Sequence, residues 1–200
     1  MAQIIISFLT GVLGPIAVLF IKNWLEKKKK IDPLTEAIDN ANIIHDELDQ
    51  ILESNNADRI WIAQFHNGGH YYPTGKSIQK FSVVYELVRQ TKDTVRAGLQ
   101  NIPVSLFSKA LGEVSNTDFL GITDYKDETN ATYGLKYIAE ETHAKSTYLM
   151  AMRSFDDKLI GLLCLEFTKS SRALTKDQII ELRIEATKLA SALGTHLKVK

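Results

Sequence analysis

The sequence predicts an α+β fold in which helices flank a mostly antiparallel sheet, preceded by one transmembrane helix and a helical stalk. Residues 4–21 carry no charge, which is typical of a membrane span. Residues 146–167 contain two apolar-rich segments joined by the turn sequence FDDK, which indicates a β-hairpin. Helical segments precede and follow this hairpin, as in an antiparallel sheet with helices packed on it. We therefore divide the chain into an anchor (1–24), a stalk (25–56) and a domain (57–200).

The N-terminal segment is long enough to cross a bilayer. Residues 4–21 read IIISFLTGVLGPIAVLFI, eighteen residues without a charge. As a helix they would span about 27 Å, close to the ~30 Å of a hydrocarbon core. A cleaved signal peptide would need basic residues before the apolar run, and none precedes it. A buried core helix is also disfavoured, because the run has no polar face and ends in a lysine cluster. We predict an uncleaved anchor.

A tryptophan and several lysines follow the anchor at the depth of the membrane interface. The sequence KNWLEKKKK supplies them, and lysines next to a membrane helix favour the cytoplasmic side. They also attract anionic lipid headgroups. We therefore predict a single-pass protein of the inner (cytoplasmic) membrane with a cytoplasmic C-terminal domain. The predicted interface residues are Lys22, Trp24, Lys27, Lys28, Lys29 and Lys30.

The stalk contains an amphipathic helix. Asp32 suits its cap and Pro33 its first position. Its apolar stripe then recurs at spacings of four and three residues, with one histidine: Leu34, Ile38, Ala41, His45, Leu48 and Leu52. Such a stripe fits either a coiled-coil seam between two copies or a helix that lies on its own domain. The sequence leaves both open, so self-association through the stalk is one of two interpretations.

The first part of the domain alternates strands and helices. RIWIAQF and SIQKFSVVYELV are rich in β-branched and aromatic residues and are predicted strands. PVSLFSKALGEV has helical spacing, and DFLGITDY is a short strand candidate. ATYGLKYIAEETHA is a predicted helix with Asn130 as its cap.

The last part of the domain is a hairpin and a long helix. STYLMAMRS and KLIGLLCLEFT are the two predicted strands of the hairpin. Thr175 and Gln178 have the spacing of a capping box, and Leu174 and Ile179 that of a hydrophobic staple. The core-facing stripe of the helix is Ile179, Leu182, Ala186, Leu189, Leu193 and Leu197.

The composition limits the possible functions. Acidic and basic residues number 24 each, so the net charge gives no indication of a nucleic-acid partner. The one cysteine, Cys164, lies in the apolar run LIGLLCLEF. A lone cysteine matches no zinc spacing, and a catalytic thiol needs an electropositive, partly open setting. We therefore predict that Cys164 is a buried core residue.

Residues 145–193 resemble the second half of a GAF domain, a member of the PAS/GAF superfamily, and residues 57–197 do so more loosely. The pattern is a small residue opening a strand, an IGxLxL strand and an LTxxD helix start. It matches Ser146, Ile160, Gly161, Leu163, Leu165, Leu174, Thr175 and Asp177. The resemblance implies a GAF fold with Gly161 at a close-packed position. It also implies a module that binds small molecules or partner proteins, signals through its flanking helices and is not an enzyme.

Two ligands bound by members of the GAF family, cyclic nucleotides and bilins, are not implied by these residues. The NKFDE signature of cyclic-nucleotide-binding members is missing, and Cys164 lies on the wrong element to attach a bilin. We therefore predict no cofactor.

The chain is also similar to the holins of T-even bacteriophages and to phage-encoded membrane-anchored proteins without assigned function. All share a single membrane helix joined to a small domain. In the holins that domain faces the periplasm, whereas the lysines here favour the cytoplasm. The alternative function implied is a lysis protein whose membrane helix oligomerises while its domain controls timing.

The stretch QFHNGGHYYPTGKSIQK contains the candidate ligand site. A P-loop has four residues between its first glycine and its Gly-Lys pair, but five residues separate Gly69 from Gly75. A metal site on a helix is disfavoured, because two glycines separate the histidines and no carboxylate lies nearby in the sequence to complete the ligand set. A hydrolytic site is disfavoured because no carboxylate is visible that would orient a catalytic histidine. Asn-Gly predicts a turn that gathers aromatic and polar groups at one end of the sheet. The candidate residues are His66, Asn67, Gly68, His70 and Tyr72. Alternatively, these side chains only hold the loop in shape.

The sequence as a whole therefore predicts a membrane-anchored, non-catalytic sensing or interaction module of phage or bacterial origin. Its expected partners are the lipid bilayer, a second copy through the stalk, and a protein or small-molecule ligand. No metal site is predicted.

Overall fold

The computed structural model describes residues 14–28, 32–71, 73–89, 94–128 and 131–197. The chain forms two compact units, Met1–Asn42 and Ile43–Lys200. The first contains helix α2 (Gly14–Lys28) and the beginning of α3 (Pro33–Ser54). The second contains the rest of α3 and all of the sheet.

Helix α2 has an apolar, exposed surface. Its exposed large apolar side chains are Ile16, Val18, Leu19, Phe20, Ile21 and Trp24. No helix within the described ranges has both the length and the apolar character that a membrane span requires. Most of the predicted anchor, residues 4–13, lies outside those ranges, as do Lys29 and Lys30. Lys22 is exposed on α2, and Lys27 and Lys28 are its last residues.

The second unit is built on a six-stranded sheet in which every pair of neighbours is antiparallel, as predicted. The strand order is β3-β2-β1-β6-β5-β4. The strands are β1 (Arg59–His70), β2 (Ser77–Val88), β3 (Ile102–Pro103), β4 (Phe119–Ile122), β5 (Ser146–Arg153) and β6 (Leu159–Phe167). The other elements are the 3-10 helix η3 (Val104–Phe107), α4 (Ser108–Thr117), α5 (Lys136–Glu141) and α6 (Lys176–Leu197).

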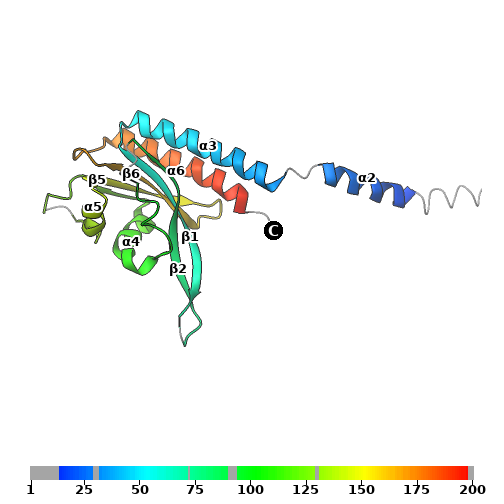
Figure 1. Cartoon of the computed structure of the whole chain (residues 1–200), viewed down its shortest axis with the longest axis horizontal. Coiled ribbons are helices and arrows are strands. Elements are labelled where there is room, and N and C mark those ends of the chain that lie inside the picture. Colours follow the sequence, from blue (N-terminus) through cyan, green and yellow to red (C-terminus); the bar gives the residue numbers. More distant parts are fainter. Residues whose placement is uncertain (1–13, 29–31, 72, 90–93, 129–130, 198–200) are drawn as a thin grey trace, which may run out of the picture. The chain divides into compact units, whose positions relative to one another are not determined.

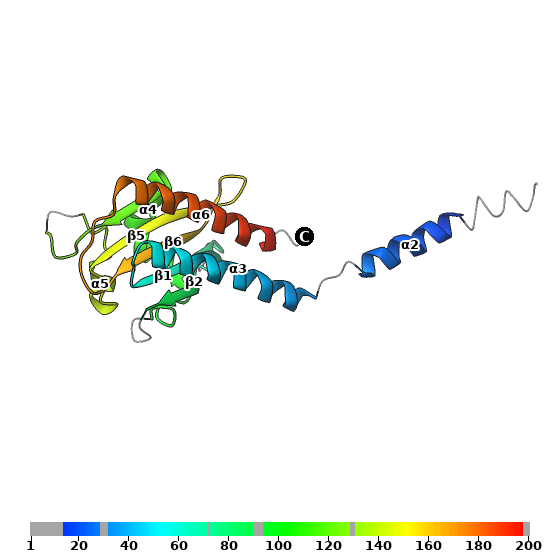
Figure 2. The same ribbon diagram turned by 90° about the horizontal axis from the view of Figure 1, so that it is seen from above.

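Helices cover both faces of this sheet (Figures 1 and 2). The part of α3 that belongs to the second unit packs with α6 against one face, around Ile62, Met150 and Leu163. Helices α4 and α5 cover the other face, around Trp61 and Leu162. Because both faces of the sheet are covered, β5 and β6 are buried along most of their length instead of alternating between buried and exposed residues, and β6 is apolar at every position except Glu166.

The second half of α3 is part of the domain core. Ile44, Leu48, Ile51 and Leu52 are buried against the sheet and α6, so for this half the helix lies on its own domain. His45, expected within the apolar stripe, is exposed, and its ring makes a T-shaped contact with the ring of Tyr85 at 5.6 Å between centroids. The compact unit accordingly begins at Ile43, before the predicted boundary at residue 57.

The final helix begins as predicted. The Thr175 N–H donates to Oε1 of Gln178 at 3.0 Å, and the Gln178 N–H donates to Oγ1 of Thr175 at 3.2 Å. This is the reciprocal pattern of a capping box. The β5–β6 hairpin also closes as expected, with the Ser154 N–H bonded to the Lys158 carbonyl at 2.9 Å.

The helix predicted at residues 131–144 is much shorter in the structure. Helix α5 covers only Lys136–Glu141, because Tyr133 and Gly134 both have positive φ and break any earlier helical turn. The predicted cap, Asn130, lies outside the described residues.

Two predictions about β6 are confirmed. Cys164 is fully buried, and this burial raises the pKa of its thiol well above the ordinary value, which keeps the sulfur unreactive. Gly161 faces the adjacent strand so closely that a Cβ atom would lie 2.4 Å from the carbonyl oxygen of Ala63.

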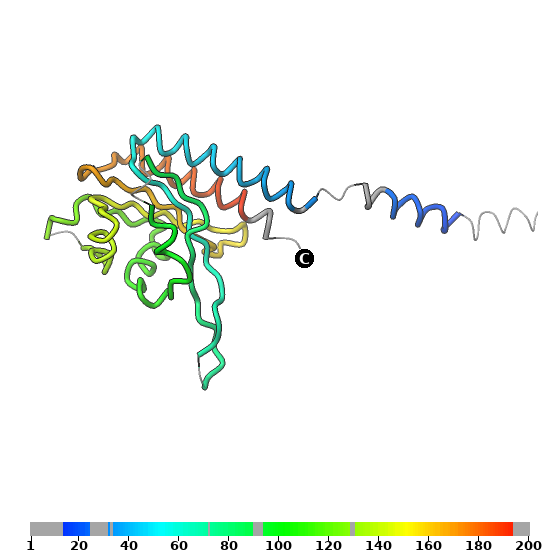
Figure 3. The backbone as a smooth tube through the Cα atoms, in the orientation of Figure 1, coloured from blue at the N-terminus to red at the C-terminus, as the bar shows by residue number. Residues whose placement is uncertain are grey.

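The predicted turn at Asn67 and Gly68 is wrong. Both residues lie within β1, and β1 and β2 continue together beyond the rest of the sheet as a long hairpin (Figure 3). The chain turns between Tyr71 and Lys76, where the Gly75 N–H bonds the Tyr71 carbonyl at 2.8 Å. Gly75 has a φ of +68°. Asn-Gly predicts a turn because both residues accept positive φ, but here long-range pairing with β2 keeps the strand extended.

Candidate functional site

The candidate residues from the sequence lie on the projecting β1–β2 hairpin. The ring of His66 reaches Oγ of Ser82 with Nε2 at 2.9 Å. Asn67 pairs in register with Gln79, and His70 is exposed. The side chain of Lys80 lies over Gly68, and its Cδ would be 2.4 Å from a Cβ added at Gly68. Tyr72 lies outside the described residues. These four described residues share a hairpin, and none of them lines the cavity described next.

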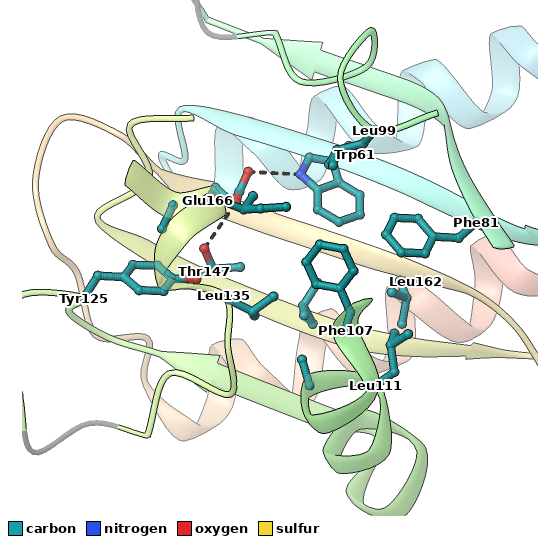
Figure 4. Close-up of a pocket in the computed structure, with 14 residues that line it drawn as sticks. Trp61, Phe81, Leu99, Phe107, Leu111, Tyr125, Leu135, Thr147, Leu162 and Glu166 are labelled. Atoms are coloured by element: carbon teal, nitrogen blue, oxygen red, sulfur yellow. Dashed lines mark hydrogen bonds between the residues drawn. The ribbon is translucent and has the colours of Figure 1, made fainter. Parts of the chain in front are cut away.

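A cavity lies between the sheet and the layer of α4 and α5 (Figure 4). Its volume is about 50 Å³. The floor comes from β1, β2, β5 and β6, and the roof comes from η3, α4, α5 and the segments beside them. Most of the lining is apolar: Trp61, Phe81, Leu99, Phe107, Ala110, Leu111, Leu135, Ile138, Ala139, Leu149 and Leu162.

One end of the cavity is polar because a buried carboxylate lies there. Oε2 of Glu166 accepts from Arg59 Nε at 2.7 Å and from Trp61 Nε1 at 3.0 Å, and Oε1 accepts from Thr147 Oγ1 at 3.1 Å. The sheet register brings these groups together, since Arg59 and Thr147 both pair directly with Glu166. The Arg59 guanidinium also donates to the carbonyl of Thr142. Arg59 is 0% and Glu166 5% exposed, so this is a buried, hydrogen-bonded ion pair.

Tyr125 closes the same end from the loop after β4. Its hydroxyl points toward Thr147 (Figure 4). Burial raises the pKa of this phenol far above its ordinary value, and the negative charge of Glu166 raises it further. Tyr125 therefore stays a neutral hydrogen-bond donor at any physiological pH.

The lining offers aromatic faces and a few polar groups at one end, the usual composition of a small-molecule site. Drug-sized ligands occupy about 300–1,000 Å³, so a ligand of that size would require the roof to move outward. No group of three potential metal ligands occurs among the residues that the structure describes.

This site was not predicted from the sequence. Its polar end combines residues that are 107 positions apart, Arg59 and Glu166, and nothing in a single sequence connects them. One signal was present: Glu166 is a charge inside the otherwise apolar run LIGLLCLEF. A charge in a fully buried strand needs a partner, which could have marked this position.

The central antiparallel sheet, with two long helices on one face and a cavity under short helices on the other, defines a GAF fold. No family model and no curated protein matches the chain. Solved structures do match. The GAF domain of PixJ from Thermosynechococcus elongatus, in its blue-light-absorbing form, has 19% identity and a TM-score of 0.62, with 81% of this chain and 89% of that chain covered.

Two further structures support the same assignment. A GAF domain from Synechocystis sp. PCC6803, in its photoproduct state, has 18% identity and a TM-score of 0.61, over 79% of this chain and 95% of that one. The GAF domain region of a putative membrane protein from Geobacter sulfurreducens PCA has 14% identity and a TM-score of 0.59, over 82% of this chain and 99% of that one. The second unit of this chain therefore has a GAF fold.

Proposed function

We propose that this protein is a membrane-anchored, non-catalytic sensing module that binds a small molecule in the cavity between the sheet and α4 and α5. The observation that carries the proposal is the cavity itself, with its apolar walls and its hydrogen-bonded polar end at Glu166. The GAF fold of several light-sensing proteins adds support by analogy.

The end of α4 provides a route from the cavity to α6. Ala110 and Leu111 of α4 line the cavity. The carboxylate of Asp118, which follows α4, lies 2.8 Å from Arg153 Nε on β5 and 3.5 Å from Arg183 Nη2 on α6. A ligand that displaces α4 would therefore also displace α6, because Asp118 is paired with Arg183. The response would pass from α3 and α6 to a partner protein.

Filling the cavity should abolish ligand binding. Leu111 is buried and lines the cavity, whereas Leu106 on the neighbouring η3 is 69% exposed. Some compounds of a metabolite panel are expected to stabilise the wild type against heat. We expect the same compounds to stabilise Leu106→Trp by the same amount and to give Leu111→Trp no stabilisation. A ligand at 100 times its dissociation constant adds about 2.7 kcal/mol, which a thermal unfolding assay resolves.

Each variant is compared with itself in the absence of ligand, because overpacking by Leu111→Trp alone costs about 1–3 kcal/mol. A ligand-induced shift that survives in Leu111→Trp would contradict binding in this cavity.

The anchor proposal rests on the uncharged residues 4–21 and on the exposed apolar surface of α2. We expect the full chain to remain in the membrane fraction after carbonate washing, and a reporter fused after Lys200 to be active in the cytoplasm. A charge near the centre of a membrane helix costs about 2.5–3.5 kcal/mol, so Val12→Arg should release part of the protein, whereas Val12→Leu should not. Recovery of the wild type in the soluble fraction, or a reporter that is active only on the non-cytoplasmic side of the membrane, would contradict this proposal.

The holin-type alternative gains no support from the described residues, and we do not propose it.

A further inference from the structure

A second hollow lies directly outside the cavity, on the surface beside α5. It has a volume of about 440 Å³. We call it the lysine cleft, because Lys126, Lys136 and Lys145 line it together with His143. The acidic groups that face it are Asp124 and Glu140.

The lysines of this cleft are available to bind an anion. Lys126, Lys136 and Lys145 make no ion pair with any residue that the structure describes, whereas Lys158, Lys169 and Lys188 elsewhere do. Asp124 is already engaged, since its Oδ1 accepts the backbone N–H of Lys126 at 2.9 Å. The cleft therefore presents three ammonium groups whose charge is not neutralised by direct pairing.

The cavity and the lysine cleft share a wall. Tyr125 and Ala139 line both of them. The Tyr125 ring is buried and belongs to a loop, so its rotation would join the two hollows without moving a strand. The space that the ring vacates would also let the small cavity accept an aromatic ring.

The charges differ on the two sides of this wall. Inside, Glu166 is negative and already has three donors, so a second anion there would be repelled in a poorly solvated space. Outside, the cleft supplies positive charge next to water. An anionic group is stable only on the outer side.

From these observations we infer that the ligand reaches the cavity through the lysine cleft by displacing Tyr125. We infer further that it is a small molecule with an apolar or aromatic body, which enters the cavity, and an anionic group, which stays among the lysines. This inference rests on the proposed function, because it assigns a ligand class to the same cavity.

Two probes of nearly equal shape test the ligand class. 3-Phenylpropanoate and 3-phenylpropanamide differ in charge but not in ring or chain length. Binding is followed on full-length protein by the indole N–H signals of its two tryptophans in nitrogen-15 NMR. Trp61 lines the cavity, and Trp24 on α2 serves as an internal control. We expect only the Trp61 signal to shift, with the carboxylate binding about threefold to tenfold more tightly, as one or a few exposed charge pairs would give.

Matched variants separate the cleft from general charge effects. The double variant Lys126→Gln/Lys136→Gln should lose the preference for the carboxylate and bind the two probes about equally tightly. Lys76→Gln/Lys176→Gln removes two exposed lysines elsewhere and should leave the preference unchanged. Tyr125→Ala should tighten the binding of both probes, because it opens the shared wall. High salt should weaken the carboxylate more than the amide.

The possible outcomes are distinguishable. Equal binding of both probes, or a preference for the amide, would overturn the anionic ligand class while leaving cavity binding intact. A preference for the carboxylate that survives in Lys126→Gln/Lys136→Gln would overturn the role of the cleft. If neither probe shifts Trp61 at millimolar concentration, in the wild type or in Tyr125→Ala, this inference fails, whereas the proposed function fails only if no compound of the metabolite panel stabilises the wild type.

Discussion

Arg59→Met is expected to lower the free energy of unfolding by about 3–5 kcal/mol, the usual cost of leaving one partner of a buried ion pair unpaired. The variant keeps the apolar volume of the side chain but leaves Glu166, 5% exposed, without its cation. The donors from Trp61 and Thr147 remain, and they do not neutralise the charge. Chemical denaturation of the two proteins measures the difference. Since domains are commonly stable by only 5–15 kcal/mol, this loss is a large share of the total stability.

The second substitution that checks this reasoning is Glu166→Gln in the Arg59→Met background. If the cost arises from an uncompensated buried charge, removing that charge should recover a large part of the lost stability. Glu53→Gln is the control. It removes an exposed partner of Arg89 and should change stability by less than about 1 kcal/mol. A double variant no more stable than Arg59→Met would mean that lost packing, and not charge, dominates.

Gly161→Ala is expected to destabilise the domain by about 1–3 kcal/mol, as inserting a methyl group into a filled space does. The added Cβ would lie 2.4 Å from the carbonyl oxygen of Ala63, and a backbone atom in a sheet ladder cannot move aside easily. β1 and β6 would have to separate where Gln64 pairs with Gly161. Because Ala63 and Leu162 belong to the core beneath the cavity layer, the strain should reach the site as well. The measurement is the midpoint of urea unfolding.

Gly112→Ala is the matched control for this prediction. Gly112 lies within α4, and a Cβ there would meet no atom within 4 Å. Alanine is favoured over glycine in a helix interior by about 0.5–1 kcal/mol, so this variant should be more stable than the wild type. Equal effects of the two substitutions would contradict a specific close contact at Gly161.

Local signals predicted the elements that depend on near neighbours in the chain. The Thr175–Gln178 capping box needs only residues three apart, and both of its hydrogen bonds form. The β5–β6 hairpin needs only a short turn between two apolar runs, and it closes at Ser154 and Lys158. Asn-Gly at Asn67 misled the prediction, since pairing with β2 kept those residues extended.

The sequence alone determined the mostly antiparallel α+β class and the burial of Cys164, because apolar runs and turns act over a few residues. The tight position of Gly161 was expected only from the resemblance to GAF domains. The tertiary structure alone decided which polar groups form the site. Pairing of β1 with β6 and of β6 with β5 sets Arg59, Glu166 and Thr147 in one row, although they are distant in the chain. It also decided that half of α3 belongs to the core. Both depend on strand register and on helix packing against a sheet, which no local pattern specifies.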